Sequence, residues 1–160
     1  MIVISLDQAM KTTGWCVFEN KKIVDCGTFK VIEKADIGQR LVEFMSKISD
    51  LYNKYHFDHL VFEDIQQQHG DVSTYKKLAY VQSAIYIWCY EHNINCTVYA
   101  PSSWRKITGG NYGKKREEQK KVAIDNVLKW YNIEVDSDTA DAICIGKAFF
   151  EEDKNKKSAF

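Results

Sequence analysis

The first thirty residues carry hydrophobic side chains in the short runs that are typical of β-strands. The segment MIVISLD is an apolar run that ends on an acid, and TTGWCVFEN and KKIVDCGTFKVI are rich in β-branched and aromatic residues. Asn20 and Lys21 stand between the last two runs, where a tight turn would connect neighbouring strands. The pattern therefore predicts three consecutive strands in an antiparallel meander.

From residue 36 the hydrophobic spacing changes to that of an amphipathic helix. Apolar side chains recur at intervals of three and four residues, at Ile37, Leu41, Phe44, Met45, Ile48, Leu51, Tyr52 and Tyr55. Asp36, followed three residues later by Gln39, has the spacing of an N-terminal capping box. We expect a helix over residues 36–55.

The rest of the chain alternates short strands with helices. HLVFED and INCTVYA read as strands. Four helices are expected: from Asp71 or Ser73 to about Glu91, a short one from Pro101, from Arg116 to Trp130, and from Ser137 to Phe150. The third of these should face inward with Ile124, Val127, Leu128 and Tyr131. This order favours an α/β fold, a mixed five-stranded sheet with helices on both faces. Strands 2–6 and 58–62 then lie parallel and adjacent, so that their carboxyl ends meet at one edge.

Length and composition predict one soluble domain over residues 1–150 and a charged tail over 151–160. No apolar run approaches the roughly 20 residues of a membrane span, and the N-terminus lacks the basic segment of a signal peptide. The 5 cysteines are odd in number and show no CxxC spacing, so a disulfide framework is not expected. We expect a cytoplasmic protein with no membrane partner, in the host cytoplasm if a phage encodes it.

The formal net charge of zero conceals a basic segment. Residues 101–132 carry eight basic and three acidic side chains, whereas the segments on either side are net acidic. GKKREEQKK supplies Lys114, Lys115, Arg116, Lys120 and Lys121, after a glycine-rich loop and at the start of a helix. Backbone N–H groups and cations at a helix start suit phosphate oxygens, although a solvated helix face with a pair such as Glu117–Lys121 is the alternative.

Carboxylates gather at the edge where the two parallel strands end. Asp7 ends the first strand and Glu63 the fourth, while Asp138 and Asp141 share one face of the last helix. Four converging carboxylates form a hard oxygen site for Mg²⁺ or Mn²⁺, and two such ions about 4 Å apart promote phosphoryl displacement. We therefore predict two Mg²⁺ ions here, with Mn²⁺ as a substitute.

Each acid also has a structural alternative. Asp7 alone is consistent with a turn residue, and Asp138 with the N-cap of its helix. Glu63 and Asp64 point to opposite faces of a strand, so at most one of them is an inward ligand. Asp141 lies in the apolar stretch TADAICIG, where an unpaired acid is costly.

Four segments in order resemble the RuvC-type Holliday junction resolvases. DQAMKTTGWCVF resembles the opening strand–turn–strand of that family, LVFED its second acidic strand, YAPSSWRK the segment after its fifth strand, and DTADAICIG its C-terminal acidic helix. The likeness covers about residues 1–150. It implies an RNase H-like fold and a metal-dependent endonuclease for branched DNA, whose four metal-binding acids match Asp7, Glu63, Asp138 and Asp141.

One departure concerns the loop after the second acid. The bacterial resolvases carry an aromatic there that is thought to wedge into the junction, whereas this chain has DIQQQHG, with Ile65 and Gln66. Small RuvC-like phage enzymes, which cut a wider range of branched DNA, are the relatives that this departure favours. We expect three-way junctions to be cut at rates comparable to four-way junctions.

Two other functions share these acids or this surface. Another RNase H-like nuclease, acting on RNA–DNA hybrids or as an exonuclease, would use the same chemistry, and a branched-DNA binding protein would need no metal. Paired cutting of a junction implies a homodimer. The helix ending near Glu91 carries Leu78, Val81, Ile85 and Trp88 on one stripe, with Tyr75, Ala79 and Tyr86 elsewhere around it. The second apolar area would pair with its copy, unless the C-terminal helices cover it.

Overall fold

The computed structural model describes residues 1–66, 72–109, 112–113 and 115–157, with 153–157 described by their backbone. The element order agrees with the predicted one. The elements are β1 (Ile2–Asp7), β2 (Thr12–Glu19), β3 (Lys22–Lys30), α1 (Ile37–Tyr55), β4 (His59–Glu63), α2 (Val72–Glu91), β5 (Asn95–Tyr99), α3 (Pro101–Thr108), α4 (Arg116–Tyr131) and α5 (Ser137–Lys157).

The five strands form one mixed sheet in the order β3-β2-β1-β4-β5. β1 to β3 make an antiparallel meander, and β1–β4 and β4–β5 are parallel. Leu6 pairs with Phe62 at the end of the β1–β4 ladder, so the next residues, Asp7 and Glu63, come out at the same edge. The predicted meeting of these strand ends is confirmed.

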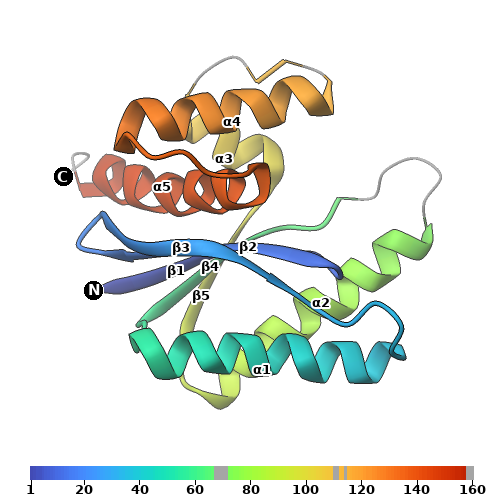
Figure 1. Cartoon of the computed structure of the whole chain (residues 1–160). Helices are drawn as coiled ribbons and strands as arrows, with labels where there is room; N and C mark the ends of the chain where they lie inside the picture. Colours follow the sequence, from blue (N-terminus) through green and yellow to red (C-terminus); the bar gives the residue numbers. More distant parts are fainter. Residues whose placement is uncertain (67–71, 110–111, 114, 158–160) are drawn as a thin grey trace.

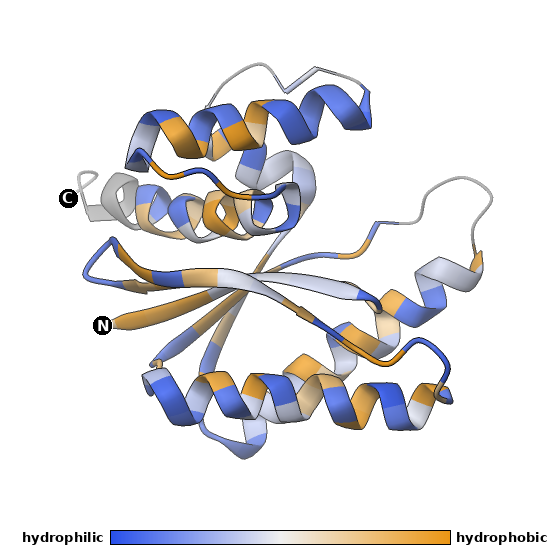
Figure 2. Ribbon diagram, viewed as in Figure 1, coloured by the Kyte–Doolittle hydropathy of each residue, from blue (hydrophilic) through white to orange (hydrophobic). Residues whose placement is uncertain are grey.

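Helices cover both faces of the sheet, as predicted. Figure 1 shows α1 and α2 on one face and α5 on the other, with α3 and α4 packed beyond α5. Each face has its own hydrophobic core, because alternate residues of the central strands point to opposite sides: Ile4 and Leu6 pack toward α1 and α2, and Val3 toward α5. In Figure 2 the central strands are mainly hydrophobic, whereas the first turns of α4 are hydrophilic.

Local signals fix the turns and caps. Asn20 and Lys21 have φ values of 50° and 72°, the left-handed conformation of a tight hairpin turn. The Asp36 side chain accepts a hydrogen bond from the Gln39 N–H, which confirms the predicted cap of α1.

Two details differ from the expectations. The last helix was expected to end at Phe150, but α5 continues to Lys157. The Tyr99 hydroxyl donates to Glu152 and Lys147 pairs with Glu151 at 3.4 Å, so these contacts hold the extra turns. Leu128 was expected inward but is 42% exposed, because α4 packs through the face that contains Val127. Within the described chain, no helix is both long and apolar enough to span a bilayer.

Candidate active site

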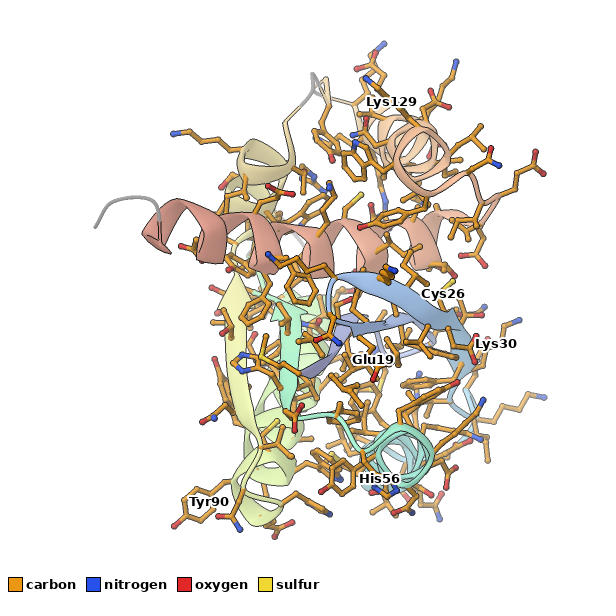
Figure 3. The ribbon with its side chains drawn as sticks, turned by 90° about the vertical axis from the view of Figure 1, so that its left-hand side faces the viewer. Glu19, Cys26, Lys30, His56, Tyr90 and Lys129 are labelled. Atoms are coloured by element: carbon orange, nitrogen blue, oxygen red, sulfur yellow. The ribbon has the colours of Figure 1, made fainter. Side chains whose placement is uncertain are left out.

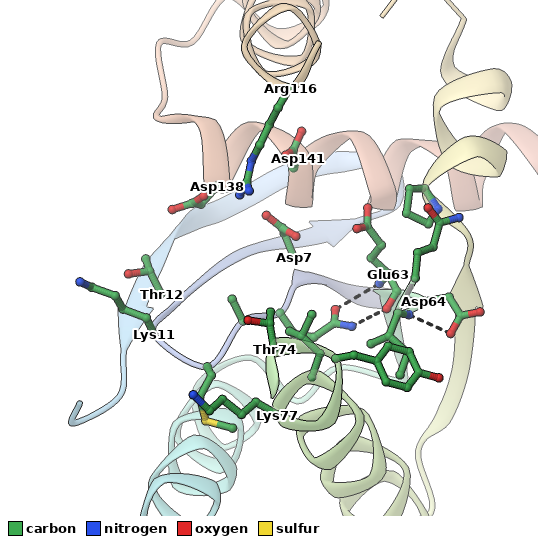
Figure 4. Close-up of a pocket in the computed structure, with 18 of the residues that line it drawn as sticks. Asp7, Lys11, Thr12, Glu63, Asp64, Thr74, Lys77, Arg116, Asp138 and Asp141 are labelled. Carbon is green, nitrogen blue, oxygen red and sulfur yellow. Dashed lines mark hydrogen bonds between the residues drawn. The ribbon is translucent and has the colours of Figure 1, made fainter. Parts of the chain in front are cut away.

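A cleft of about 660 Å³ opens where β1 and β4 end and α5 begins. All four acids predicted from the sequence line it: Asp7, Glu63, Asp138 and Asp141. Figure 4 shows Asp7 and Glu63 at the ends of two strands and Asp138 and Asp141 on α5, around this cleft. The structure therefore brings together residues that lie up to 134 positions apart in the chain.

Two contacts fix Glu63 beside Asp7. The buried Gln8 side chain accepts from the Glu63 N–H at 3.2 Å and donates to the Glu63 carbonyl, so it extends the β1–β4 pairing by one step. Trp104 is fully buried, and its indole N–H donates to Glu63 Oε2 at 2.6 Å. The Glu63 carboxylate is therefore held by a group that cannot move without disturbing the core.

Close approach of α5 to the sheet places the other two acids. The Ser5 hydroxyl donates to the Ala142 carbonyl at 2.6 Å. Gly14, which pairs with Asp7, lies so close to the start of α5 that a Cβ atom there would be 2.0 Å from the Asp138 carbonyl oxygen. Only glycine permits this contact, which explains the Thr-Gly of the second strand.

The alternative role of Asp138 as a helix cap is not what the structure shows. The neighbouring Asp136 supplies the cap, because its Oδ1 accepts from the Thr139 N–H at 2.8 Å. Asp138 lines the cleft instead. Asp64 is likewise engaged in local structure: its Oδ1 accepts from the Gln82 side chain at 3.1 Å.

Asp7, Glu63 and Asp141 resist ionisation in this setting. Burial, followed by the charges of Asp141, Glu63 and Asp138, raises the pKa of Asp7 well above its ordinary value. Burial and the charge of Glu63 raise the pKa of Asp141 to about 7. Burial also raises the pKa of Glu63, while the Trp104 hydrogen bond and Arg105 oppose that rise. Such a cluster favours positive charge from outside the chain.

The donor set fits a hard divalent cation, since carboxylate oxygens are the ligands that Mg²⁺ and Mn²⁺ prefer. The four side chains nevertheless do not form a closed cage: among the described residues, no three carboxylate, imidazole or thiol groups are placed to hold one ion. Repulsion among the acids favours such an open arrangement.

The basic segment reaches the cleft through only part of its length. Arg116 and Lys120 line the cleft, whereas Lys115 and Lys121 are exposed outside it. The predicted DNA-binding residue Lys114 lies outside the described residues. Glu117 and Lys121, both described, form no ion pair, so the pairing expected of a merely solvated face is not seen.

Sequence reasoning missed Arg105 as a site residue. Its guanidinium lies 4.8 Å from the Trp104 ring centroid, and its buried Nε has no hydrogen-bond partner among the described residues. Its charge lowers the pKa values of Asp7, Glu63 and Asp141. The segment YAPSSWRK stands out only by its resemblance, and a single cation at the fifth position of a short helix carries no signal of its own.

The loop that departs from the bacterial pattern borders the same cleft. Ile65 and Gln66 line it, and the remainder of the loop, residues 67–71, lies outside the described residues. Tyr75, half-buried in the first turn of α2, also lines the cleft. An aromatic side chain is therefore present near the acids, although it follows the loop instead of standing in it.

Comparison with known proteins places the chain in a family. Residues 3–148 match the family described as crossover junction endodeoxyribonuclease RuvC. The RuvC of Rickettsia typhi is 27% identical over 149 residues, which cover 91% of this chain and 94% of that one. The RuvC of Dictyoglomus thermophilum is 26% identical over 158 residues, covering 95% and 99%. These relatives are bacterial, and a closer relationship to phage enzymes stays a prediction.

The fold also matches a solved structure. The structure of T. thermophilus RuvC in complex with a Holliday junction substrate superposes with a TM-score of 0.79 at 13% sequence identity, covering 96% of this chain and 95% of that one. This likeness supports the RNase H-like fold that the resemblance implied, and the strand order agrees with it. With the family match extending over nearly the whole chain, the protein belongs to the crossover junction endodeoxyribonuclease RuvC family.

Proposed function

We propose that this protein is a metal-dependent, structure-selective endonuclease that cuts Holliday junctions and other branched DNA. The observation that carries the proposal is the convergence of Asp7, Glu63, Asp138 and Asp141 on one cleft, in a chain that belongs to the RuvC family. Hydrolysis of a phosphodiester at this cleft would leave 5′-phosphate and 3′-hydroxyl ends.

The four acids would hold two Mg²⁺ ions, with Mn²⁺ as a substitute, which would stabilise the charges on the attacking and leaving oxygens. The raised pKa values of Asp7 and Asp141 support this assignment, because a cation relieves both the burial and the mutual repulsion of the carboxylates. Trp104 would keep the Glu63 carboxylate in one orientation. Arg105 would offset part of the remaining negative charge beside the acids.

The substrate would be held by cations at the rim. Arg116 and Lys120 of α4 line the cleft beside the acids, where a phosphate of the DNA backbone can reach them. We assign the enzyme to the cytoplasm, a compartment that keeps thiols reduced, and all of its cysteines are free.

We propose a two-fold homodimer that pairs through α2. The stripe of α2 that faces away from the core exposes Tyr80, Tyr86, Ile87 and Tyr90 by 49%, 42%, 57% and 87%. Figure 1 shows that α4 and α5 cover the opposite face of the sheet, so the alternative in which they cover this stripe is not what the structure shows. Figure 3 shows Tyr90 pointing away from the molecule. A two-fold contact here would give one complex two active sites for paired cuts.

The test is cleavage of labelled four-way junctions, three-way junctions, linear duplexes and RNA–DNA hybrids, with and without Mg²⁺. We expect paired nicks in both junctions at comparable rates with Mg²⁺, and little cleavage of linear DNA or hybrid. Efficient cleavage of the hybrid alone would identify a different RNase H-like nuclease. Tight junction binding with no metal-dependent cleavage would identify a binding protein.

Two substitutions give this test its control. Asp7→Asn removes a ligand charge and should abolish cleavage while junction binding is kept or tightened. Asp50→Asn makes the same chemical change at an exposed position of α1 outside the cleft and should leave cleavage unchanged. Normal cleavage by the Asp7 variant would refute the site assignment.

A further inference from the structure

A second group of basic side chains lines the cleft on the side away from α4. It consists of Lys11 from the β1–β2 loop, Arg40 from α1 and Lys77 from α2, which we call the α1–α2 basic group. Figure 4 shows Asp7 between Lys77 and Arg116, with Lys11 on the same side as Lys77. No charge run marks these residues, since the fold gathers them from three separate segments.

Arg40 is held in place as a cation. Its Nη2 donates to the Met10 carbonyl, which ties the guanidinium to the β1–β2 loop directly after Asp7. Its Nε is buried and has no hydrogen-bond partner among the described residues. A buried donor without a partner is costly, and because Arg40 lines the cleft, a small shift of its side chain would let an anionic oxygen there accept from it.

The two lysines are available to an anion. Lys77 is exposed and forms no ion pair within the described part of the chain. Lys11 pairs with Glu33 at 2.8 Å, but both side chains are more than half exposed, and such surface pairs contribute little. A phosphate can therefore compete for both lysines at small cost.

The charge pattern of the cleft shows why cations are needed on two sides. The described lining residues include five carboxylates, from Asp7, Glu63, Asp64, Asp138 and Asp141. These repel a DNA strand that enters. Arg116 and Lys120 attract the strand from the α4 side only. A strand held on one side alone can swing about that contact, and a displacement of about 1 Å at the reacting phosphate can cost on the order of 100-fold in rate.

We propose that the α1–α2 basic group binds a backbone phosphate of the cleaved strand, on the opposite side of the acids from Arg116 and Lys120. The strand then crosses the carboxylates with a phosphate anchored at each side, which fixes the position of the scissile bond. This inference rests on the proposed endonuclease function and adds a phosphate subsite to it. It concerns the DNA backbone, so it predicts no preference for base sequence.

The chain offers a matched pair of variants for the test. Lys77→Gln and Lys76→Gln remove the same charge from neighbouring exposed residues of α2, but only Lys77 lines the cleft. Both changes are made in an Asp7→Asn background, so that junction binding is measured without cleavage. Lys77→Gln should lower the log–log salt slope of binding by roughly 0.9, the effect of one duplex phosphate contact, and Lys76→Gln should not.

A scan with single uncharged methylphosphonates along the cleaved strand locates the subsite. In the background protein and in Lys76→Gln, neutralising one phosphate beside the scissile position should weaken binding. In Lys77→Gln the same neutralisation should have no further effect. Arg40→Lys, which keeps the charge, should retain more of the salt slope than Arg40→Gln, with thermal unfolding checking that both variants fold.

The outcomes separate the two hypotheses. If the wild-type chain cuts junctions and Lys77→Gln matches Lys76→Gln in both slope and scan, the phosphate subsite is wrong and the endonuclease function stands. If the wild-type chain neither binds nor cuts branched DNA, both the endonuclease function and the phosphate subsite are wrong.

Discussion

Substituting Gly14 by alanine should separate DNA binding from cleavage. The added Cβ would lie 2.0 Å from the Asp138 carbonyl oxygen, whereas Cβ atoms essentially never approach closer than 3.0 Å. The start of α5 must therefore retreat by about 1 Å, and it carries Asp138 and Asp141 with it. A displacement of that size at reacting groups can cost on the order of 100-fold in rate, or about 2.7 kcal/mol.

Two quantities are measured. One is the single-turnover rate of four-way junction cleavage at saturating enzyme and Mg²⁺, and the other is the affinity for the same junction in EDTA. We expect the rate of Gly14→Ala to fall about 100-fold and the affinity to stay within about twofold, because the rim cations are untouched. Crowding against α5 should also lower stability by about 1–3 kcal/mol, as overpacking does elsewhere, so the rate is measured well below the midpoint of unfolding.

Gly27→Ala is the control. It makes the same change on the neighbouring strand β3, where the new Cβ would meet a Trp15 side-chain atom at 3.3 Å, a contact that a small shift relieves. Its cleavage rate should stay near that of the wild type. If Gly14→Ala also cleaved at the wild-type rate, close approach of α5 to β2 would not be what positions the acids.

Trp104→Phe keeps an aromatic side chain, though a smaller one, and removes the N–H that holds Glu63. We therefore expect the Mg²⁺ concentration for half-maximal cleavage to rise about 10- to 100-fold, with Trp88→Phe, which makes the same change away from the acids, as the control. In EDTA the melting temperature should fall as pH rises from about 4 to 7, because folding raises the pKa of Asp141 from 3.8 to about 7, so over this range the folded state keeps a proton that the unfolded state has lost; Asp141→Asn should flatten the profile. Ile87→Glu should give a folded monomer by sedimentation that nicks junctions without pairing the cuts, and a dimer that survives would place the interface elsewhere.

Much of the fold was readable from local pattern. Alternating and continuous apolar runs predicted the five strands, and the spacing of three and four residues predicted the helices. The acids of the cleft were found for the same reason: Asp7 and Glu63 end apolar strands, and Asp141 interrupts an apolar helix face. Each of these signals depends on residues that are close in sequence, so no tertiary information was needed.

The helix ends were less predictable. Nothing in the residues after Phe150 alone shows that α5 goes on, because its last turns depend on Glu152 meeting the Tyr99 hydroxyl of β5. The sequence offered Asp138 as a cap of this helix, but Asp136 supplies it in the structure, while Asp138 stands where α5 approaches Gly14. These choices depend on the distance between two elements, which local pattern does not contain.

Local pattern predicted the elements, the adjacency of the first and fourth strands and the acids of the cleft, but not which cations and hydrogen-bond donors surround those acids. Lys77 stands in no charge run or motif, and the resemblance of YAPSSWRK does not single out Trp104 or Arg105, yet Lys77 and Arg105 line the cleft and Trp104 holds Glu63 there. The physical reason is that hydrophobic periodicity shows which face of an element is buried. It does not show which distant side chain will stand opposite a given atom, because that depends on how whole elements pack.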